Sequence, residues 1–301
     1  MISKVIGKFA TFKFENNKDS RLFFCTDIHG KFRLLQESLK LLRFVNFPYS
    51  GEKTDKLICL GDIGDRGENS FSSLSAFRDN PNFFSLLGNH DLLLVNGTRE
   101  PPKISKFNMF ATLRSRDRSQ WIDEGGAWHQ NHDFSSIKLL GDWADTLPFA
   151  AQVEIGEHII GLTHSSIVSN ELFNKDNKPD FSNSNVKWSN TVSTTKEYNS
   201  ITDILRKKKL INAIIFDRKP IRQDLALNVI GVDAMLHGHT LQEGTPKVLG
   251  NSISFDTGAF LMKKKSFSAL TILEYAPSED SVLGLFKIHQ FKENDDGVYK
   301  I

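Results

Sequence analysis

The chain has 301 residues, of which 39% are hydrophobic, and its 38 basic and 36 acidic side chains leave a formal net charge of +2. This composition supports an ample core, and the mixed charges give no strong signal for a nucleic-acid or membrane partner. No apolar run approaches the roughly 18 residues of a membrane span, and the N-terminus lacks the apolar segment of a secretion signal. We therefore expect a cytoplasmic protein.

The N-terminal part of the chain alternates strand and helix patterns. Residues 3–14 alternate apolar and polar side chains like a strand, and a polar turn separates them from the apolar run at residues 22–25. After Gly30, apolar residues recur at helical spacing over residues 32–42, ahead of the breaker at residues 48–51. This order predicts a strand, a loop and a helix.

The same order repeats further along the chain. Residues 57–60 predict a strand, residues 70–78 a helix and residues 83–87 a third strand. Such a βαβαβ arrangement has parallel strands covered on both faces, with functional groups beyond the carboxyl ends of the strands. Cys25 and Cys59 lie inside two of the apolar runs, which predicts core residues on neighbouring strands rather than a disulfide.

The second half of the chain has a less regular pattern. Residues 101–145 predict a helical insert with Trp121, Trp128 and Trp143 as packing anchors. The Asn- and Ser-rich residues 165–200 predict a long surface loop. Further strands are predicted at residues 150–155, 158–164, 232–236, 252–255 and 269–273. Because no internal repeat or linker is evident, we expect a single domain over residues 1–301.

Polar residues that suit metal chemistry follow the predicted strands: Asp27, His29, Asp62, Asp65, Asn89, His90, His164 and His239. Oxygen and imidazole donors without thiolates favour Mn²⁺, Fe or Zn²⁺ over calcium or an iron–sulfur cluster. Asp62 lies on the middle strand and is placed to bridge two metals, which together can stabilise a phosphoryl displacement. Arg66 would add a bidentate phosphate donor to the same pocket.

Five short motifs occur in a fixed order: DIHG at residues 27–30, GDIGDRG at 61–67, GNHD at 88–91, TH at 163–164 and GHT at 238–240. Together they resemble the calcineurin-like metallophosphoesterases. Within that group the chain is most similar to the phosphoprotein phosphatase family, in the bacterial and phage branch typified by lambda phosphatase. The resemblance implies an α/β fold, a β-sandwich of two mixed sheets flanked by helices (α/β/β/α). Asp91 departs from the family pattern, which usually has glutamate there.

The resemblance also implies roles for the matching residues. The metal ligands would be Asp27 and His29 at one ion, Asp62 between the two, and Asn89, His164 and His239 at the other. The catalytic residues would be His90 as general acid, Asp65 as its orienting carboxylate, and Arg66 and Arg218 as phosphate-binding groups. The cofactor would be two divalent ions, Mn²⁺ first, with Fe or Zn²⁺ as alternatives, and a metal-bound water would attack phosphorus directly. We count His237 as a neighbouring or core histidine and not as a ligand.

These features predict a phosphomonoesterase, a protein phosphatase for serine/threonine first and tyrosine second, acting on a phosphorylated protein or a small phosphoester. A bis(5'-nucleosyl)-tetraphosphatase is the nearest alternative, and Asp65 argues against it, because that group tends to lack this aspartate. A nucleic-acid-end phosphatase or phosphodiesterase usually carries further domains that this chain has no room for. A non-catalytic binding module would have lost ligands that are all present here.

Overall fold

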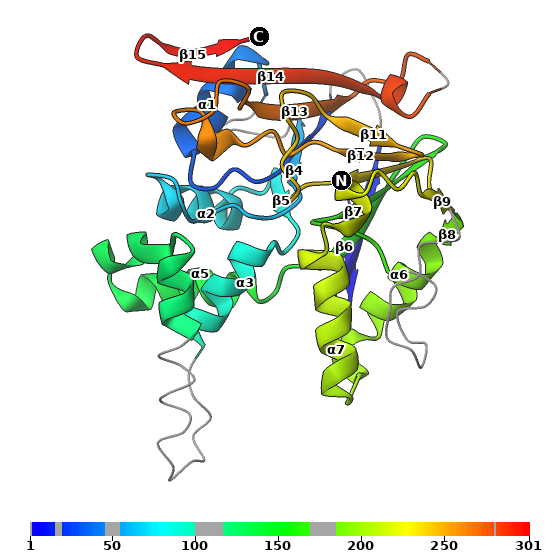
Figure 1. Cartoon of the computed structure of the whole chain (residues 1–301), viewed down its shortest axis with the longest axis horizontal. Coiled ribbons are helices and arrows are strands. Elements are labelled where there is room, and N and C mark those ends of the chain that lie inside the picture. Colours follow the sequence, from blue (N-terminus) through cyan, green and yellow to red (C-terminus); the bar gives the residue numbers. More distant parts are fainter. Residues whose placement is uncertain (1, 16–19, 46–54, 100–116, 169–184, 280) are drawn as a thin grey trace.

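Two mixed β-sheets form the centre of the protein in a computed structural model, which describes residues 2–15, 20–45, 55–99, 117–168, 185–279 and 281–301 (Figure 1). Seven strands form one sheet, in the order β1 (Ile2–Ile6), β2 (Phe9–Phe14), β6 (Ala150–Ile155), β7 (His158–Thr163), β10 (Ala234–His237), β12 (Ser252–Ser254) and β11 (Lys247–Leu249). Six strands form the other, in the order β15 (Gly297–Lys300), β14 (Phe286–Asn294), β13 (Leu270–Tyr275), β3 (Leu22–Cys25), β4 (Lys56–Cys59) and β5 (Phe83–Ser85).

The six-stranded sheet contains the predicted βαβαβ unit. Strands β3, β4 and β5 are parallel neighbours, linked by α1 (Phe32–Leu41) and α2 (Ser70–Asp79). Cys25 and Cys59 face each other across β3 and β4, and both are buried free thiols. The parallel arrangement and the positions of the cysteines are therefore confirmed.

The side chains of these strands alternate between two hydrophobic layers, as the two-residue period of a strand requires. Phe23 and Leu57 point into the layer shared with α1 and α2, whereas Phe24 and Ile58 point into the layer between the two sheets. On the outer face of the seven-stranded sheet, Phe9 packs with residues of α6 (Trp188–Lys196). The layers are thus helix, sheet, sheet and helix, which confirms the predicted fold class.

Three further helices of eight residues or more lie in the described part of the chain. They are α3 (Asn89–Thr98), α5 (Phe134–Ala144) and α7 (Ile204–Ile211), and the short α8 (Lys219–Arg222) follows α7. In Figure 1, α2, α3 and α5 lie together on one side of the molecule, and α6 and α7 lie on the other. In the part of the chain that the structure describes, no helix has the length and apolar character needed to cross a membrane.

Residues 185–200 correct the prediction of a surface loop. They form β8 (Asn185–Lys187), which pairs in parallel with β9 (Asn228–Ile230), then α6 and a short 3-10 turn. The prediction was wrong because polar Ser, Thr and Asn hide two buried anchors, Val186 and Trp188. The part of the predicted loop at residues 169–184 lies outside the described residues.

The predicted insert at residues 101–145 is helical where it is described. Residues 117–123 form a helix, a 3-10 helix follows at Gly126–Asn131, and α5 completes the segment. Residues 101–116 lie outside the described part of the chain.

At the two ends of the chain the strands differ from those expected. Residues 3–14 form a hairpin of β1 and β2 and not one strand, since Gly7 adopts a φ of 60° and turns the chain. β14 and β15 were not predicted at all. The charged sequence FKIHQFKEN obscures the alternation of β14, which is only half-buried.

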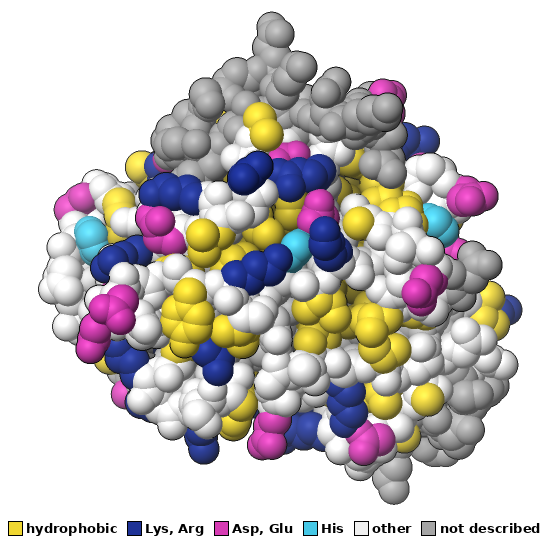
Figure 2. Space-filling model, turned by 90° about the horizontal axis from the view of Figure 1, so that it is seen from above, with side chains coloured by type: hydrophobic (Ala, Val, Ile, Leu, Met, Phe, Trp, Pro, Cys, Tyr) yellow, Lys and Arg dark blue, Asp and Glu magenta, His cyan; other side chains and the backbone are white. Residues whose placement is uncertain are grey.

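Charges are spread over the surface. Acidic and basic side chains are interspersed on the face drawn in Figure 2, with basic ones gathered around a histidine near its middle. This distribution agrees with the charge mixing along the sequence.

Candidate metal centre

The predicted site residues follow the ends of five strands from both sheets. The loop after β3 carries Asp27 and His29, the loop after β4 carries Asp62, Asp65 and Arg66, and Asn89 and His90 open α3 after β5. His164 follows β7, and His239 lies two residues beyond β10. The structure brings these residues together around Asp62.

The backbone of these loops is unusual. Among the described residues, eight other than glycine have a positive φ, and six of them are predicted site residues: Asp27, His29, Asp62, Asp65, Arg66 and His239. Left-handed backbone is sparsely populated by residues with a side chain, and such strain clusters at functional sites. The chain therefore holds the candidate ligands in conformations that the local sequence alone does not favour.

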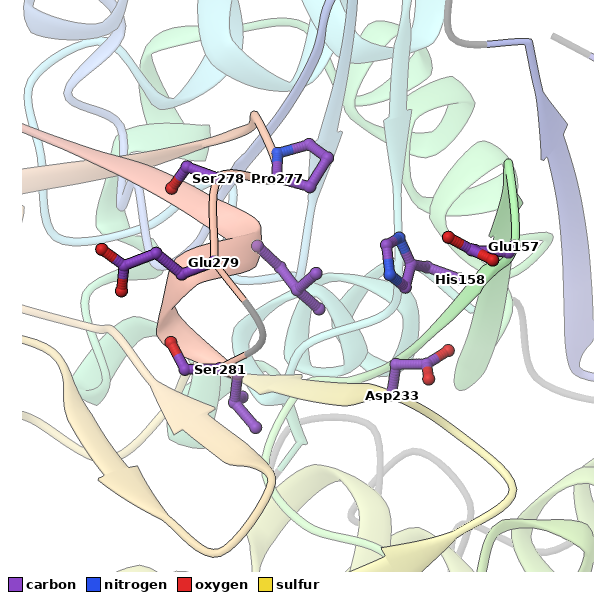
Figure 3. Close-up of a pocket in the computed structure, with 9 residues that line it drawn as sticks. Glu157, His158, Asp233, Pro277, Ser278, Glu279 and Ser281 are labelled. Atoms are coloured by element: carbon purple, nitrogen blue, oxygen red, sulfur yellow. The ribbon is translucent and has the colours of Figure 1, made fainter.

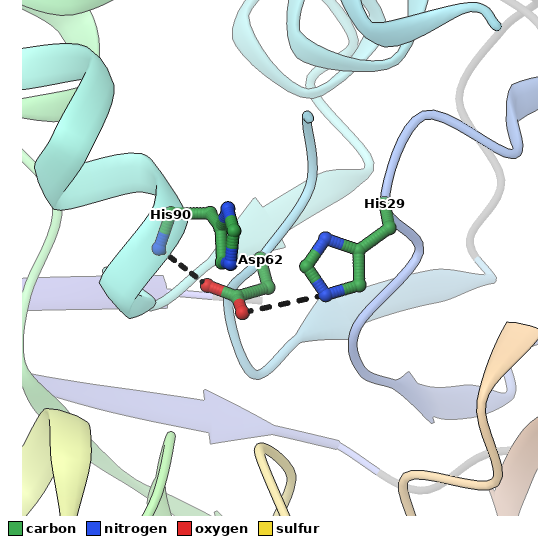
Figure 4. A group of neighbouring side chains, drawn as sticks. All are labelled: His29, Asp62 and His90. Carbon is green, nitrogen blue, oxygen red and sulfur yellow. Dashed lines mark hydrogen bonds and ion pairs between the residues drawn. The ribbon is translucent and has the colours of Figure 1, made fainter. Parts of the chain in front are cut away.

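Asp62 lies between His29 and His90 (Figure 4). Its Oδ1 accepts a hydrogen bond from the backbone N–H of His90 at 2.9 Å and lies 3.5 Å from His164 Nε2. Its Oδ2 lies 3.6 Å from His29 Nε2. Gly88 packs directly against Asp62, where any side chain would collide with the carboxylate. The two oxygens of Asp62 thus face two different imidazoles.

The group around His164 consists of hydrogen-bond acceptors that face one another. His164 Nδ1 donates to the carbonyl of Leu60 at 2.8 Å, which leaves a lone pair on Nε2. That lone pair faces Asn89 Oδ1 at 3.2 Å as well as Asp62. His239 Nε2 donates to the carbonyl of Phe216 at 3.2 Å, leaving its Nδ1 free to accept. Acceptors gathered in this way repel one another unless a cation lies among them.

The group around His29 also consists of hydrogen-bond acceptors that face one another. His29 Nδ1 donates to the carbonyl of Gly64 at 3.1 Å, so Nε2 carries the lone pair. Asp27 Oδ1 lies 3.9 Å from that nitrogen, and its Oδ2 accepts from the backbone N–H of His239 at 2.8 Å. Arg66 Nη1 donates to His29 Nε2 at 3.1 Å and so occupies the lone pair that a metal would use.

The electrostatics of the buried groups agree with this donor set. Burial, Asp27 and Asp91 together raise the pKa of Asp62 to about 8. Burial, with His164 and Arg218 nearby, lowers the pKa of His239 to about 2, and burial also lowers the pKa of His164. Imidazoles beside crowded carboxylates form two groups that could each hold a metal ion, His29 with Asp62 and His90, and Asp62 with His164 and His239. The residues present therefore fit two divalent cations that share Asp62.

His90 has one nitrogen engaged and one free. Its Nδ1 contacts Asp65 Oδ2 at 3.0 Å, while Nε2 is buried and has no hydrogen-bond partner among the described residues. Burial would lower the pKa of His90, but Asp62 and the hydrogen bond to Asp65 outweigh burial and raise it. A buried imidazole with one unpartnered nitrogen beside the metal groups can deliver a proton to a bound substrate.

Two tryptophans hold Asp65 in place. Trp121 Nε1 donates to Asp65 Oδ1 at 2.9 Å and to Oδ2 at 3.1 Å, and Trp128 Nε1 donates to Oδ1 at 2.7 Å. We expected these tryptophans only as packing anchors. The local sequence QWIDEGGAW carries no signal for these hydrogen bonds.

The two predicted phosphate-binding arginines border one cavity, of about 630 Å³, together with the candidate ligands Asn89 and His239. The Arg66 guanidinium stacks over the Phe260 ring at 4.6 Å. Arg218 precedes α8 and has a buried Nε without a hydrogen-bond partner in the described part of the chain. Both guanidinium groups are thus placed beside the candidate metal centre.

Asp91 and Asp256 are buried carboxylates near the site, and the sequence predicts no role for either of them. Asp91 accepts from the backbone N–H groups of Gly88 (2.9 Å), Asp62 (2.8 Å) and Ile63 (3.2 Å). It therefore joins the loop that carries Asp62 to the start of α3. Burial, followed by the charges of Asp27 and Asp62, raises the pKa of Asp256, and its Oδ1 accepts from Gly258 N at 2.8 Å.

Replacing Asp91 by alanine should destabilise the fold. Three buried N–H groups would lose their acceptor, at about 1–3 kcal/mol each, so we expect Asp91→Ala to lower the free energy of unfolding by about 3 kcal/mol or more. Urea denaturation measures this loss. Asp142→Ala is the matched control, because Asp142 is exposed. If both variants lost a similarly small free energy of unfolding, a structural role for Asp91 would be contradicted.

His237 is a core histidine that makes stability depend on pH. Burial lowers its pKa to about 4, and its Nδ1 contacts Thr163 Oγ1 at 2.8 Å. Between about pH 6.5 and 4 the unfolded chain binds a proton here that the folded chain does not. The free energy of unfolding should therefore fall as the pH drops through this window, by up to about 1.4 kcal/mol per pH unit.

Urea denaturation of chelator-treated protein at pH 7 and pH 5 tests this dependence. His237→Gln should show a smaller loss of stability between the two values than the wild type does. His132→Gln, at an exposed position, should match the wild type. An undiminished loss in His237→Gln would show that His237 does not contribute.

A second cavity, of about 500 Å³, contains none of the predicted site residues (Figure 3). It lies between the β6–β7 turn and the segment that follows β13, where Glu157, His158, Asp233 and Glu279 line it. Asp233 accepts from the backbone N–H of Ile159 at 2.6 Å, and His158 Nδ1 contacts the Tyr275 hydroxyl at 2.8 Å. These contacts connect the lining residues to the surrounding strands.

The layered fold and the paired His/Asp groups define a phosphoesterase of the metal-dependent class. Residues 20–243 match the family model of the calcineurin-like phosphoesterases, and the chain belongs to that family. Among curated proteins, serine/threonine-protein phosphatase 2 of Escherichia coli is 33% identical over 102 residues, which is 34% of this chain and 37% of that protein. The match thus spans little more than a third of that relative.

Two solved structures share the fold. A cold-active protein-tyrosine phosphatase from a psychrophilic Shewanella aligns with a TM-score of 0.50 and 16% identity, over 96% of this chain and 81% of that one. A protein serine/threonine phosphatase from Saccharomyces cerevisiae aligns with a TM-score of 0.52 and 16% identity, over 95% and 84% of the two chains. At this identity the likeness concerns the fold alone.

Proposed function

We propose that the protein is a phosphomonoesterase dependent on two metal ions, and that it removes phosphate from serine, threonine or tyrosine residues of proteins, with serine and threonine preferred. The observation that carries this proposal is the position of Asp62 between two imidazole lone pairs, with the free Nε2 of His90 beside it. The curated relative, a serine/threonine phosphatase, supports the substrate class.

Each group of residues has a distinct task in the proposed reaction. Asp27, His29, Asp62, Asn89, His164 and His239 would hold two divalent ions, with Mn²⁺ as our first choice. When bound, the ions would supply charge stabilisation and a water nucleophile of lowered pKa. Arg66 and Arg218 would bind and orient the phosphoryl oxygens as bidentate donors. For Arg66 this requires that it release His29 Nε2, to which it now donates.

His90 would complete the reaction as general acid. Its Nε2 would donate a proton to the leaving alkoxide of the serine or threonine side chain. Asp65 would keep the ring oriented through Nδ1 and stabilise its protonated form. The pKa of His90 is shifted upward, which favours the protonated form that this task requires.

A comparison of three substrates tests the proposal. Protein stripped with chelator and resupplied with Mn²⁺ should release phosphate from a phosphoserine peptide faster than from a phosphotyrosine peptide, and faster than it cleaves diadenosine tetraphosphate. Preferential cleavage of the dinucleotide would favour the tetraphosphatase alternative. Turnover that is unaffected by chelator would show that the reaction does not depend on a metal ion.

The two indole donors to Asp65 should affect turnover through His90. Trp128→Phe keeps the aromatic ring and removes the 2.7 Å hydrogen bond. We expect kcat for a serine phosphate ester to fall about tenfold, the effect of losing one hydrogen bond to a charged group, with little change in KM or in turnover of p-nitrophenyl phosphate.

Trp188→Phe is the matched control for this variant. Trp188 Nε1 donates to Gln152 Oε1 at 3.2 Å on the outer face of the seven-stranded sheet, away from the metal centre. This variant should leave kcat for both esters unchanged. Equal losses for both esters in Trp128→Phe would indicate general damage to the fold instead of misplacement of His90.

A further inference from the structure

The cavity beside the metal centre is strongly basic. Four of its lining residues are cationic, Arg66, Arg218, Lys219 and Arg222, whereas Glu124 is the one carboxylate in the described lining. Its volume of about 630 Å³ is far larger than a single phosphate group requires. The cavity therefore has both space and positive charge beyond what one phosphoryl group uses.

The two arginines on one wall are ordered outward from the metal centre. The backbone N–H of Arg222 donates to the carbonyl of Arg218 at 2.9 Å, so a full helical turn relates them and their side chains share one face, about 5–6 Å apart at Cβ. Arg218 is within electrostatic reach of Asp27 and Asp62 on one side and of Arg222 on the other. Arg222 is thus the next cation beyond the position proposed for the scissile phosphate.

The charge of Arg222 is not compensated within the described structure. Burial lowers the pKa of Arg218, and the like charge of Arg222 lowers it further. Glu124 is directed at another cation, since its Oε2 lies 4.0 Å from Arg66 Nη2. No carboxylate among the described residues forms an ion pair with Arg222. Like charges one helical turn apart destabilise each other, and a bound anion would relieve that repulsion.

We propose that Arg222, with Lys219 beside it, binds a second anionic group of the substrate next to the scissile phosphate. This inference rests on the proposed phosphatase function and deepens it. The preferred substrates are phosphoesters that carry a carboxylate or another phosphate close to the phosphate that is removed. An acidic residue next to a phosphoserine and the chain of a polyphosphate both supply this chemistry.

Matched peptides test the proposal. Two phosphoserine peptides that differ only by glutamate or glutamine beside the phosphoserine are compared on the Mn²⁺-loaded wild type and on Arg222→Gln. We expect the wild type to favour the glutamate peptide about fivefold in kcat/KM, as for one partly exposed ion pair, and the preference to shrink at high salt. In Arg222→Gln the preference should vanish, so that kcat/KM becomes the same for the glutamate and the glutamine peptide.

Arg33→Gln makes the same chemical change at an exposed position on α1 outside this cavity, and it should keep the preference. Diadenosine tetraphosphate is the second substrate on which the wild type and Arg222→Gln are compared. If Arg222→Gln weakens kcat/KM for this substrate while the wild type shows no preference between the peptides, the second anion is a phosphate. If Arg222→Gln changes neither the peptide preference nor the dinucleotide kinetics, the proposal is overturned.

p-Nitrophenyl phosphate, which has a single anionic group, separates this proposal from the one on which it rests. Absence of metal-dependent turnover on this ester would contradict the phosphatase function itself. If turnover of this ester is normal and a second anionic group on the other substrates does not change kcat/KM, only the role of Arg222 is contradicted.

Discussion

Asp62→Asn is expected to abolish turnover and to weaken metal binding while leaving the fold intact. The bridging position would lose its charge, whereas the amide has the same shape as the carboxyl and one oxygen to accept the 2.9 Å hydrogen bond from His90 N. We expect kcat/KM for p-nitrophenyl phosphate to fall by at least about 100-fold, the scale for removing one electrostatic group from an active site.

Thermal melting with and without Mn²⁺ checks the predicted weakening of metal binding. A metal that binds only the folded state raises the melting temperature. That rise should shrink in Asp62→Asn, while the melting temperature in chelator stays close to that of the wild type. Asp142→Asn, the same change at an exposed aspartate, should retain both activity and the full rise. An undiminished Mn²⁺ effect in Asp62→Asn would show that this carboxylate is not a ligand.

His90→Asn should slow the reaction selectively, according to the leaving group. A general acid contributes about 10²–10⁴-fold when the leaving oxygen is basic, and much less when the leaving group is already stable as an anion. We therefore expect a large fall in kcat for a serine phosphate ester and a small one for p-nitrophenyl phosphate.

Metal content separates this effect from loss of the metal centre. In the proposed reaction the free Nε2 of His90 serves the substrate and not the metal, so His90→Asn should bind Mn²⁺ as the wild type does. Asp65→Asn should show the same dependence on leaving group, because Asp65 orients His90 through a 3.0 Å contact. Equal slowing of both esters would rule out the acid role, and loss of bound Mn²⁺ would instead make His90 a ligand.

The sequence predicted those parts of the fold in which the local pattern and the tertiary environment agree. Strands β3 and β4 are buried on both faces, so their apolar runs are continuous and easily recognised. In contrast, α6 has the sequence WSNTVSTTK, whose residues are indifferent helix formers, and it is stabilised by burial of Trp188 against Phe9. Such burial depends on chain segments that are distant in sequence.

The same distinction applies to the candidate site. The approach of Asp27, Asp62 and Asn89 could be predicted, because the ends of neighbouring parallel strands lie at one edge of a sheet. The contacts of Trp121 and Trp128 with Asp65 span 56 and 63 residues. Nothing in the local sequence indicates which buried acceptor an indole N–H will reach.

The left-handed backbone at six candidate site residues has a consequence for how the chain can evolve or be engineered. For an L-residue, this conformation costs roughly 1–2 kcal/mol, less for aspartate and asparagine, and glycine adopts it without that penalty. Glycine at His29, Arg66 or His239 would relax the backbone, so a library selected for heat resistance alone should drift toward glycine there. The retention of bulky side chains at these three positions would reveal a selective pressure other than stability.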